Sequence, residues 1–249
     1  MTLHHVLSGP PDAPVVVLGP SLGTTTALWE PQLAALESRF RVLRYDHRGH
    51  GGSPSAPGPC RIDDLAGDVL DLLDALDLPR VSYCGVSLGG MVGMWLAGHA
   101  PERVERLVLC CTTASFPAPG PWLDRAAAVR ATGTGSITAS VVGRWFTPAF
   151  REANPDVAPA FEAGLAAVDD EGYAACCEAL ASLDLRSALP AIEAPTAVVA
   201  GVHDEATPPS WGRAVADAVP GASFHLVEGA HLANVEAADA VSAILGEHL

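Results

Sequence analysis

A Gly-x-Ser-x-Gly pentapeptide, Gly85 to Gly89, constrains the fold of this chain more than any other feature. An apolar, strand-like run at 81–84 enters it, and an apolar run at 91–97, predicted to be helical, leaves it. The glycines allow a strand to turn sharply into a helix, and the turn pushes the side chain of Ser87 clear of the backbone at the N-terminus of that helix. The pentapeptide therefore predicts a nucleophile elbow, with Ser87 as the candidate nucleophile.

Composition limits what the chain can bind and where it works. Its 249 residues include 14 arginines and no lysine, and the formal net charge is −15. So acidic a chain has no general attraction for nucleic acid or for an anionic membrane, and we expect neither as a partner. The N-terminus lacks the features of a signal peptide, no apolar run is long enough to span a bilayer, and the six cysteines form no C-x-x-C motif. We therefore predict a cytoplasmic protein with free thiols.

Strand-like and helix-like segments alternate along most of the chain. Amphipathic helices are predicted at 29–36 and 62–78 from the spacing of their apolar residues. Strands are predicted at 15–18, 41–45, 81–84, 106–110, 196–200 and 223–227. This alternation is typical of an α/β protein with a mostly parallel sheet and helices on both faces.

Residues 115–190 break the alternation, because strand runs vanish there and only helix-like segments follow one another. Proline and glycine separate predicted helices at 122–130, 136–146, 159–168 and 172–183. We therefore predict an α/β core formed by 1–114 and 191–249, with a helical cap inserted at 115–190 that does not fold independently.

Three polar residues follow predicted strands in the order serine, aspartate, histidine. Ser87 lies in the elbow, Asp204 follows the strand at 196–200, and His231 follows the last strand at 223–227. A serine hydroxyl is a poor nucleophile at neutral pH unless a base accepts its proton and an acid orients that base. Because parallel strands end at one edge of a sheet, we predict that these three residues form a catalytic triad in the chain order of α/β-hydrolases.

Other titratable residues nearby are weaker candidates for these roles. His203 is expected to be a loop residue, and His225 lies within a strand, where a histidine is usually packed. Glu205 stands farther from its strand than the preceding aspartate does. His47 and His50 lie in a glycine-rich turn, and we interpret them as structural.

Backbone N–H groups are expected to complete the site. The N–H of Leu88, at the start of the elbow helix, would face a developing oxyanion. The loop after the strand at 15–18 is expected beside the elbow, and the N–H of Leu22 is the second candidate donor, since Pro20 has no N–H. A plain strand–helix connection is the alternative interpretation of this loop.

Several segments resemble those of 3-oxoadipate enol-lactone hydrolases, a family within the α/β-hydrolase superfamily. These segments are 84–96, 101–114, 144–148, 172–180 and 206–209. Pro20 departs from the family pattern, in which asparagine is expected. The resemblance implies an α/β-hydrolase fold with a mostly parallel eight-stranded sheet, helices on both faces and a helical cap insertion.

The resemblance also implies an activity, the hydrolysis of 3-oxoadipate enol-lactone to 3-oxoadipate in the β-ketoadipate pathway of aromatic degradation. Such a reaction proceeds through an acyl-enzyme and needs no cofactor and no metal. The substrate would be a small anionic lactone, so we expect a cationic clamp in the pocket. Arg144, beside the apolar wall of Trp145, is the candidate, Arg125 and Arg130 are alternatives, and a surface role for Arg144 is equally open.

Other functions use the same residues. The triad would also suit another carboxylesterase, a perhydrolase or a hydrolase of C–C bonds. A non-catalytic ligand receptor on the same scaffold is the alternative from a different class. The sequence predicts no particular oligomeric state.

Overall fold

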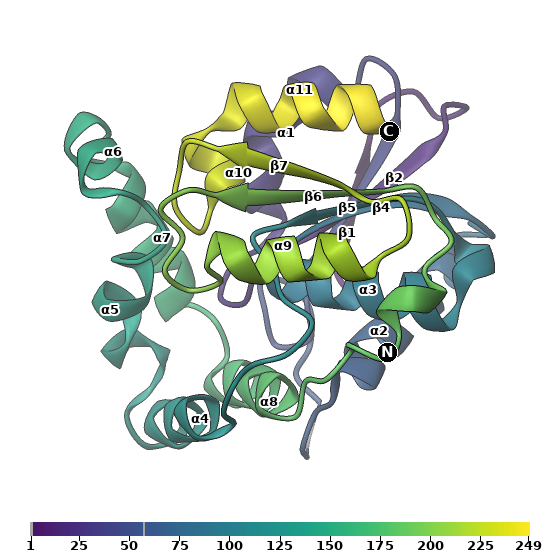
Figure 1. The fold of residues 1–249 in the computed structure, drawn as a ribbon. Helices are drawn as coiled ribbons and strands as arrows, with labels where there is room; N and C mark the ends of the chain where they lie inside the picture. The colour runs from purple at the N-terminus through teal and green to yellow at the C-terminus, as the bar shows by residue number, and fades with distance from the viewer. Residues whose placement is uncertain (1, 57) are drawn as a thin grey trace.

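A mostly parallel sheet forms the centre of the molecule (Figure 1). The computed structural model describes residues 2–56 and 58–249. Within these residues the strands are β1 His5–Ser8, β2 Val15–Gly19, β3 Arg41–Tyr45, β4 Val81–Val86, β5 Val104–Cys110, β6 Thr196–Gly201 and β7 Ser223–Val227. They lie in the order β1-β3-β2-β4-β5-β6-β7, and β1 is antiparallel to β3 whereas the other neighbours are parallel. The predicted α/β architecture is confirmed.

The expected number of eight strands is wrong, because the described residues form a seven-stranded sheet. A single short strand, β1, precedes β2. The connection between them, residues 9–14, contains three prolines, which lack the N–H group that a sheet ladder needs. The N–H of Ala13 donates instead to the carbonyl of Pro10 at 3.2 Å, so this stretch forms a turn.

Helices cover both faces of the sheet (Figure 1). One face carries α2 Ile62–Ala75, α3 Leu88–His99 and α9 Pro209–Ala218, and the other carries α1 Glu30–Leu36, α10 Ala233–Glu236 and α11 Ala238–His248. The helix predicted at 62–78 ends at Ala75, because Asp77 adopts a left-handed φ of 53° that a helix cannot continue. Helix α3 is apolar on nearly all sides and packs on β4 and β5, so the core surrounds the helix that follows the elbow.

Most of the predicted cap segment, residues 115–190, lies beyond the edge where the parallel strands end (Figure 1), whereas its last residues, near 189, pack on α3 and α9. Its α-helices are α4 Gly120–Thr132, α5 Thr138–Val142, α6 Pro148–Ala153, α7 Val157–Ala166 and α8 Asp170–Ala181. The helix predicted at 136–146 contains only the short α5, and α6 was not predicted. A signal for α6 existed, since Thr147 caps the helix by accepting from the N–H of Phe150 and Pro148 occupies its first turn.

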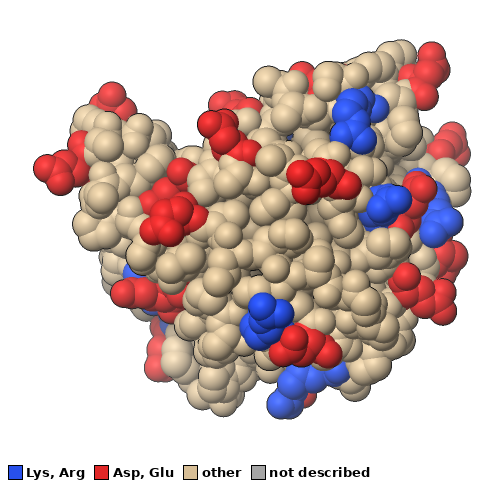
Figure 2. All heavy atoms as spheres, turned by 45° about the horizontal axis from the view of Figure 1, so that its top comes forward, with Lys and Arg blue, Asp and Glu red and all other residues tan. Residues whose placement is uncertain are grey.

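The surface reflects the acidic composition. Figure 2 shows arginine side chains scattered among carboxylates on one face of the molecule. No helix in the described part of the chain is both long and apolar enough to cross a membrane. All six cysteines are buried and unpaired.

Candidate active site

Strand β4 and helix α3 meet at Ser87, whose backbone is held in an unusual conformation. Its φ is 54° and its ψ is −114°, which is costly for a residue with a Cβ atom. Hydrogen bonds on both sides maintain this geometry. The N–H of Ser87 donates to the carbonyl of Cys110 at 2.9 Å, and the hydroxyl of Thr112 donates to the carbonyl of Ser87 at 2.8 Å.

The two glycines of the pentapeptide allow the backbones to approach closely. A Cβ atom at Gly85 would lie 2.2 Å from the carbonyl carbon of Gly89. A Cβ atom at Gly89 would lie 2.2 Å from the carbonyl oxygen of Gly19, at the end of β2. Neither position can hold a larger residue without displacing backbone, as the predicted elbow requires.

Asp204 and His231 meet in the loops that follow β6 and β7. His231 Nδ1 lies 2.9 Å from Asp204 Oδ2, and both side chains are almost fully buried. The carboxylate also accepts the N–H of Ala206 at 2.8 Å, the N–H of Thr207 at 2.9 Å and the hydroxyl of Thr207 at 2.7 Å. Burial alone raises the pKa of Asp204, but the charge and hydrogen bond of His231 and the bonds from Thr207 lower it below its ordinary value. The ionised carboxylate holds the proton on Nδ1 and leaves Nε2 of His231 as the basic nitrogen.

Ser87 and His231 line the same cavity, which has a volume of about 110 Å³. The remaining lining residues are Ser21, Leu22, Trp122, Arg125, Val141, Arg144, Trp145, Tyr173, Glu205 and Ala206. Among the described residues no hydrogen bond joins the Ser87 hydroxyl to His231. Such catalytic bonds are often long in a ligand-free enzyme and tighten when the substrate binds. The cavity thus brings the predicted nucleophile and base together, with Asp204 behind the base.

Two backbone N–H groups beside Ser87 have no acceptor in the described protein. Their neighbours are bonded: the N–H of Gly89 donates to the carbonyl of Pro20 at 3.0 Å, and that of Gly23 donates to a histidine ring at 3.0 Å. The N–H groups of Leu22 and Leu88 donate to no described residue. Leu22 lines the cavity and Leu88 follows the elbow serine, so both predicted donors are available to an oxyanion.

Two buried histidines support residues 20–24, which we call the oxyanion loop. Nε2 of His50 accepts the N–H of Gly23 at 3.0 Å, and its Nδ1 donates to a backbone carbonyl at 3.0 Å. Nε2 of His47 donates to the carbonyl of Pro20 at 2.9 Å. Burial lowers the pKa of both rings, that of His47 to about 3. Both are therefore neutral near pH 7 and hold the loop as hydrogen-bonding partners.

Arginine side chains enter the cavity from the predicted cap segment. Arg144 and Trp145 both line it, and burial together with repulsion from Arg125 lowers the pKa of Arg144. Arg125 lines the cavity too, with its guanidinium 4.6 Å from the centre of the Trp122 ring. A carboxylate in this cavity would meet two positive charges beside aromatic walls.

Three other candidates from the sequence lie outside the cavity. Arg130 pairs with two carboxylates of α8, at 2.6 Å and 2.5 Å. His203 lies 2.8 Å from an exposed glutamate, and His225 lies 2.9 Å from a serine hydroxyl of its own strand. None of the three is placed to contact Ser87.

Thr207 was missed as a site residue, although it supports Asp204 through both its N–H and its hydroxyl. Its hydroxyl also lies 3.3 Å from Nδ1 of His231. A signal was present, because the side chain of an aspartate in a loop commonly accepts backbone N–H groups two or three residues further along the chain.

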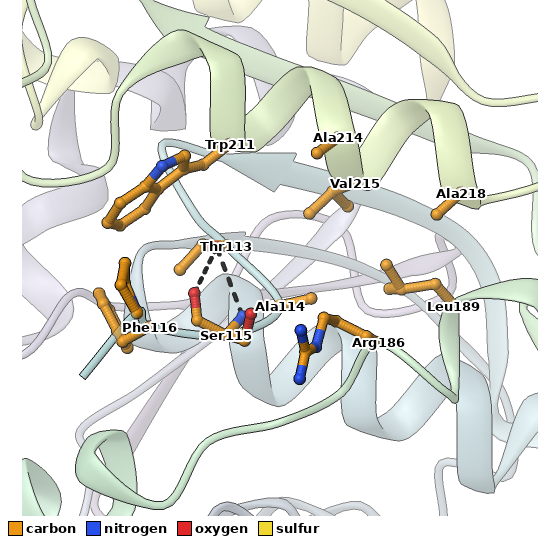
Figure 3. A pocket seen from close by; sticks show the side chains of 11 residues that line it. Thr113, Ala114, Ser115, Phe116, Arg186, Leu189, Trp211, Ala214, Val215 and Ala218 are labelled. Atoms are coloured by element: carbon orange, nitrogen blue, oxygen red, sulfur yellow. Dashed lines mark hydrogen bonds between the residues drawn. The ribbon is translucent and has the colours of Figure 1, made fainter. Parts of the chain in front are cut away.

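A larger cavity, of about 580 Å³, lies between the β5–α4 connection and α9 (Figure 3). Apolar side chains such as Phe116 and Trp211 dominate its wall, and its cation, Arg186, is paired with Asp184 at 2.7 Å. Phe116 packs edge-to-face on Trp122 of the smaller cavity, with ring centroids 5.0 Å apart. The residues that line the larger cavity include no pair of nucleophile and base, so the candidate chemistry belongs to the smaller one.

The parallel sheet and the elbow at Ser87 are typical of α/β-hydrolases, and comparison with known proteins confirms this class. A family profile described as the alpha/beta hydrolase fold matches residues 14–150. The chain belongs to the α/β-hydrolase family, and it is a hydrolase. It is 38% identical over 236 residues to 3-oxoadipate enol-lactonase 2 of Acinetobacter baylyi, which covers 95% of this chain and 88% of the relative.

Two further relatives bear on the activity. The crystal structure of the enol-lactonase from Burkholderia xenovorans LB400 superimposes with a TM-score of 0.97 at 41% identity, covering 99% of this chain and 95% of that one. A protein of Variovorax paradoxus, provisionally named carbamate hydrolase RutD, is 35% identical over 246 residues, covering 94% of this chain and 91% of the relative. The resemblance to enol-lactone hydrolases stated from the sequence is confirmed.

Proposed function

We propose that the protein hydrolyses 3-oxoadipate enol-lactone to 3-oxoadipate through an acyl-enzyme on Ser87, in the β-ketoadipate pathway. The observation that carries the proposal is the buried contact of His231 with Asp204, at a cavity that Ser87 and Arg144 also line. The likeness to enol-lactonases supports the choice of substrate, because it extends over nearly the whole chain, the predicted cap included.

In the proposed reaction, Nε2 of His231 accepts the Ser87 proton as Oγ attacks the lactone carbonyl. The carbonyl oxygen gains negative charge and accepts the N–H groups of Leu22 and Leu88, each worth about 3 kcal/mol in the transition state. Collapse of this intermediate breaks the ring and expels an enolate, a better leaving group than an ordinary alkoxide. The imidazolium of His231 gives its proton to the enolate, and tautomerisation of the resulting enol to the ketone removes the nucleophile that would otherwise close the ring again.

A second half-reaction releases the product. Water gives a proton to His231 and attacks the acyl carbonyl, and Ser87 leaves with the proton that the imidazole returns. His231 carries the protons between Ser87, the leaving group and water, and the backbone N–H groups only donate hydrogen bonds, so the proposal needs no metal and no cofactor. We place the reaction in the cytoplasm, and the six unpaired cysteines support that location because disulfides are rare in reducing compartments.

A substrate panel tests the proposal. The decay of ultraviolet absorbance of the enol-lactone is compared with release of p-nitrophenol from a neutral ester and with hydrolysis of a carbamate. We expect kcat/KM for the lactone to exceed that for the other two by about a hundredfold or more, since two arginines favour an anionic substrate. A higher kcat/KM for the carbamate than for the lactone would contradict the proposed substrate and favour a carbamate, the substrate class in the name of the RutD relative. Absence of turnover with all three substrates would favour the alternative function, a non-catalytic ligand receptor on the same scaffold.

Arg144→Ala is expected to raise KM for the lactone by about tenfold or more, because a charge-assisted hydrogen bond contributes about 1.5–3 kcal/mol. The neutral ester serves as the internal control, and its KM should change by less than about twofold. Arg125→Ala, measured in parallel, tests the alternative clamp. Equal effects of Arg144→Ala on both substrates would reject a role for Arg144 in carboxylate binding.

A further inference from the structure

Hydrogen bonds join the loop around His231 to the predicted cap. The residue after the histidine, Leu232, donates its N–H to the carbonyl of Trp145 at 3.0 Å. Trp145 is buried and lines the cavity with Arg144. The wall that would hold the substrate is thus bonded directly to the residue next to the candidate base.

Glu236 forms a second connection on the other side of the histidine. Its Oε2 accepts the N–H of Ala230, the residue before His231, at 2.9 Å. The same oxygen accepts the N–H of Thr147 at 3.1 Å, and Oε1 accepts the hydroxyl of Thr147. One carboxylate, at the end of α10, therefore ties both segments together through both of its oxygens.

The choice of a carboxylate at this position follows from the donors around it. The three groups that point at Glu236 are two backbone N–H groups and a hydroxyl, and an ionised carboxylate accepts at both oxygens and donates at neither. A glutamine of the same size would present an NH₂ group to at least one of these donors. A glutamine could keep the bonds of the two backbone N–H groups only by turning its NH₂ group toward the Thr147 hydroxyl. That hydroxyl would then lose its acceptor, and the charge that strengthens these bonds would be lost as well.

We propose that Glu236 is a positioning residue that couples residues 144–147 of the cap to His231, so that the substrate-binding wall and the base are placed as one unit. This inference rests on the proposed function, because it takes His231 as the base and Arg144 with Trp145 as the wall. It has a mechanical consequence. Opening the cap at residues 144–147 would withdraw His231 from Ser87, so access that preserves the triad has to occur through other parts of the cap.

Glu236→Gln tests the coupling, with Glu228→Gln as the matched control. Glu228 precedes the same histidine in the chain, but its side chain is 81% exposed and contacts His203. The rate of Ser87 acylation is followed as the p-nitrophenol burst from p-nitrophenyl acetate, per active site titrated with an organophosphonate. We expect it to fall at least about tenfold in Glu236→Gln and less than about twofold in Glu228→Gln. Counting only titrated sites removes any loss that is due to unfolded protein.

Hydrogen exchange measured by mass spectrometry supplies a readout that needs no substrate. Exchange in peptides covering 143–148 and 228–236 should accelerate together in Glu236→Gln, by about tenfold or more, while peptides from α3 remain protected. Acceleration confined to one of the two segments would overturn the coupling. A wild-type acylation rate in Glu236→Gln would overturn the positioning role.

Substitutions of Thr147 keep the proposal testable if Glu236→Gln does not fold. Thr147→Val removes the hydroxyl that donates to Glu236 and accepts the N–H of Phe150, and Thr147→Ser retains both contacts. Acylation should slow in Thr147→Val and stay within about twofold of wild type in Thr147→Ser; equal rates in the two variants would contradict the proposal. A protein that acylates with the ester and shows coupled exchange, but ignores the lactone, would reject the proposed substrate alone.

Discussion

Replacing Ser87 with alanine is expected to lower kcat for the lactone and for neutral esters on the order of 10⁵-fold or more. Without the hydroxyl no acyl-enzyme forms, and only substrate binding and the oxyanion donors remain. Alanine meets the same backbone constraint at a φ of 54° as serine does, because this constraint comes from the Cβ atom that both residues have. The fold should therefore persist, as a melting curve recorded beside the absorbance assay would show.

Ser21→Ala is the matched control, since it removes a hydroxyl from another buried serine in the same cavity. The carbonyl of Ser21, which accepts the N–H of Thr24 at 3.1 Å, is unaffected by this change. We expect a loss of less than about tenfold. If Ser87→Ala retained activity similar to that of Ser21→Ala, neither the elbow nor the acyl-enzyme could explain turnover.

Asp204→Asn is expected to lower kcat by about 10⁴-fold with little change in KM. The N–H groups of Ala206 and Thr207 hold Oδ1, so the new NH₂ group takes the place of Oδ2 beside His231. An NH₂ group donates, so Nδ1 of His231 has to accept, and its proton moves to Nε2. A ring protonated on Nε2 cannot accept the proton of Ser87. Steady-state kinetics at pH 7 measure the loss.

Glu205→Gln distinguishes the two adjacent carboxylates, either of which the chain order alone would allow as the orienting acid. Glu205 lines the cavity, but it has no contact with the imidazole comparable to that of Asp204. Its substitution should cost at least about a hundredfold less in kcat than Asp204→Asn. A larger loss in Glu205→Gln would assign the orienting role to Glu205 and contradict the triad proposed above.

The parallel strands and the elbow were predictable because each leaves a strong local signal. Strands buried on both faces of a sheet are continuous, mostly apolar runs, as β2, β4 and β6 show. Strand β1 escaped prediction because its four residues are only half-buried and show no clear alternation. Helices α5 and α6 are too short to be stable by their own sequence and depend on packing, which explains the errors in the cap.

In the candidate site, too, some residues can be recognised from the sequence and others only from the structure. Ser87, Asp204 and His231 could be selected from the sequence, because each follows a strand and their chemistry is specific. Thr207 and Glu236 could not be selected in this way, since their roles rest on contacts with backbone groups that only the fold brings close. Glu236, for example, meets a residue 89 positions away along the chain. Positioning residues of this kind carry no motif that periodicity or spacing reveals.

The neutral imidazoles beneath the oxyanion loop make the folded state sensitive to acid. Below about pH 6.5, the ordinary pKa of histidine, His47 and His50 bind protons in the unfolded chain. They stay neutral in the folded protein, because burial lowers their pKa there. Stability is therefore complete above that pH and declines as the pH falls below it, and the contribution of His47 continues to decline down to about pH 3. The folded state is therefore most stable near neutral pH, and this preference comes from two buried histidines that support the oxyanion loop and take no part in the proposed reaction.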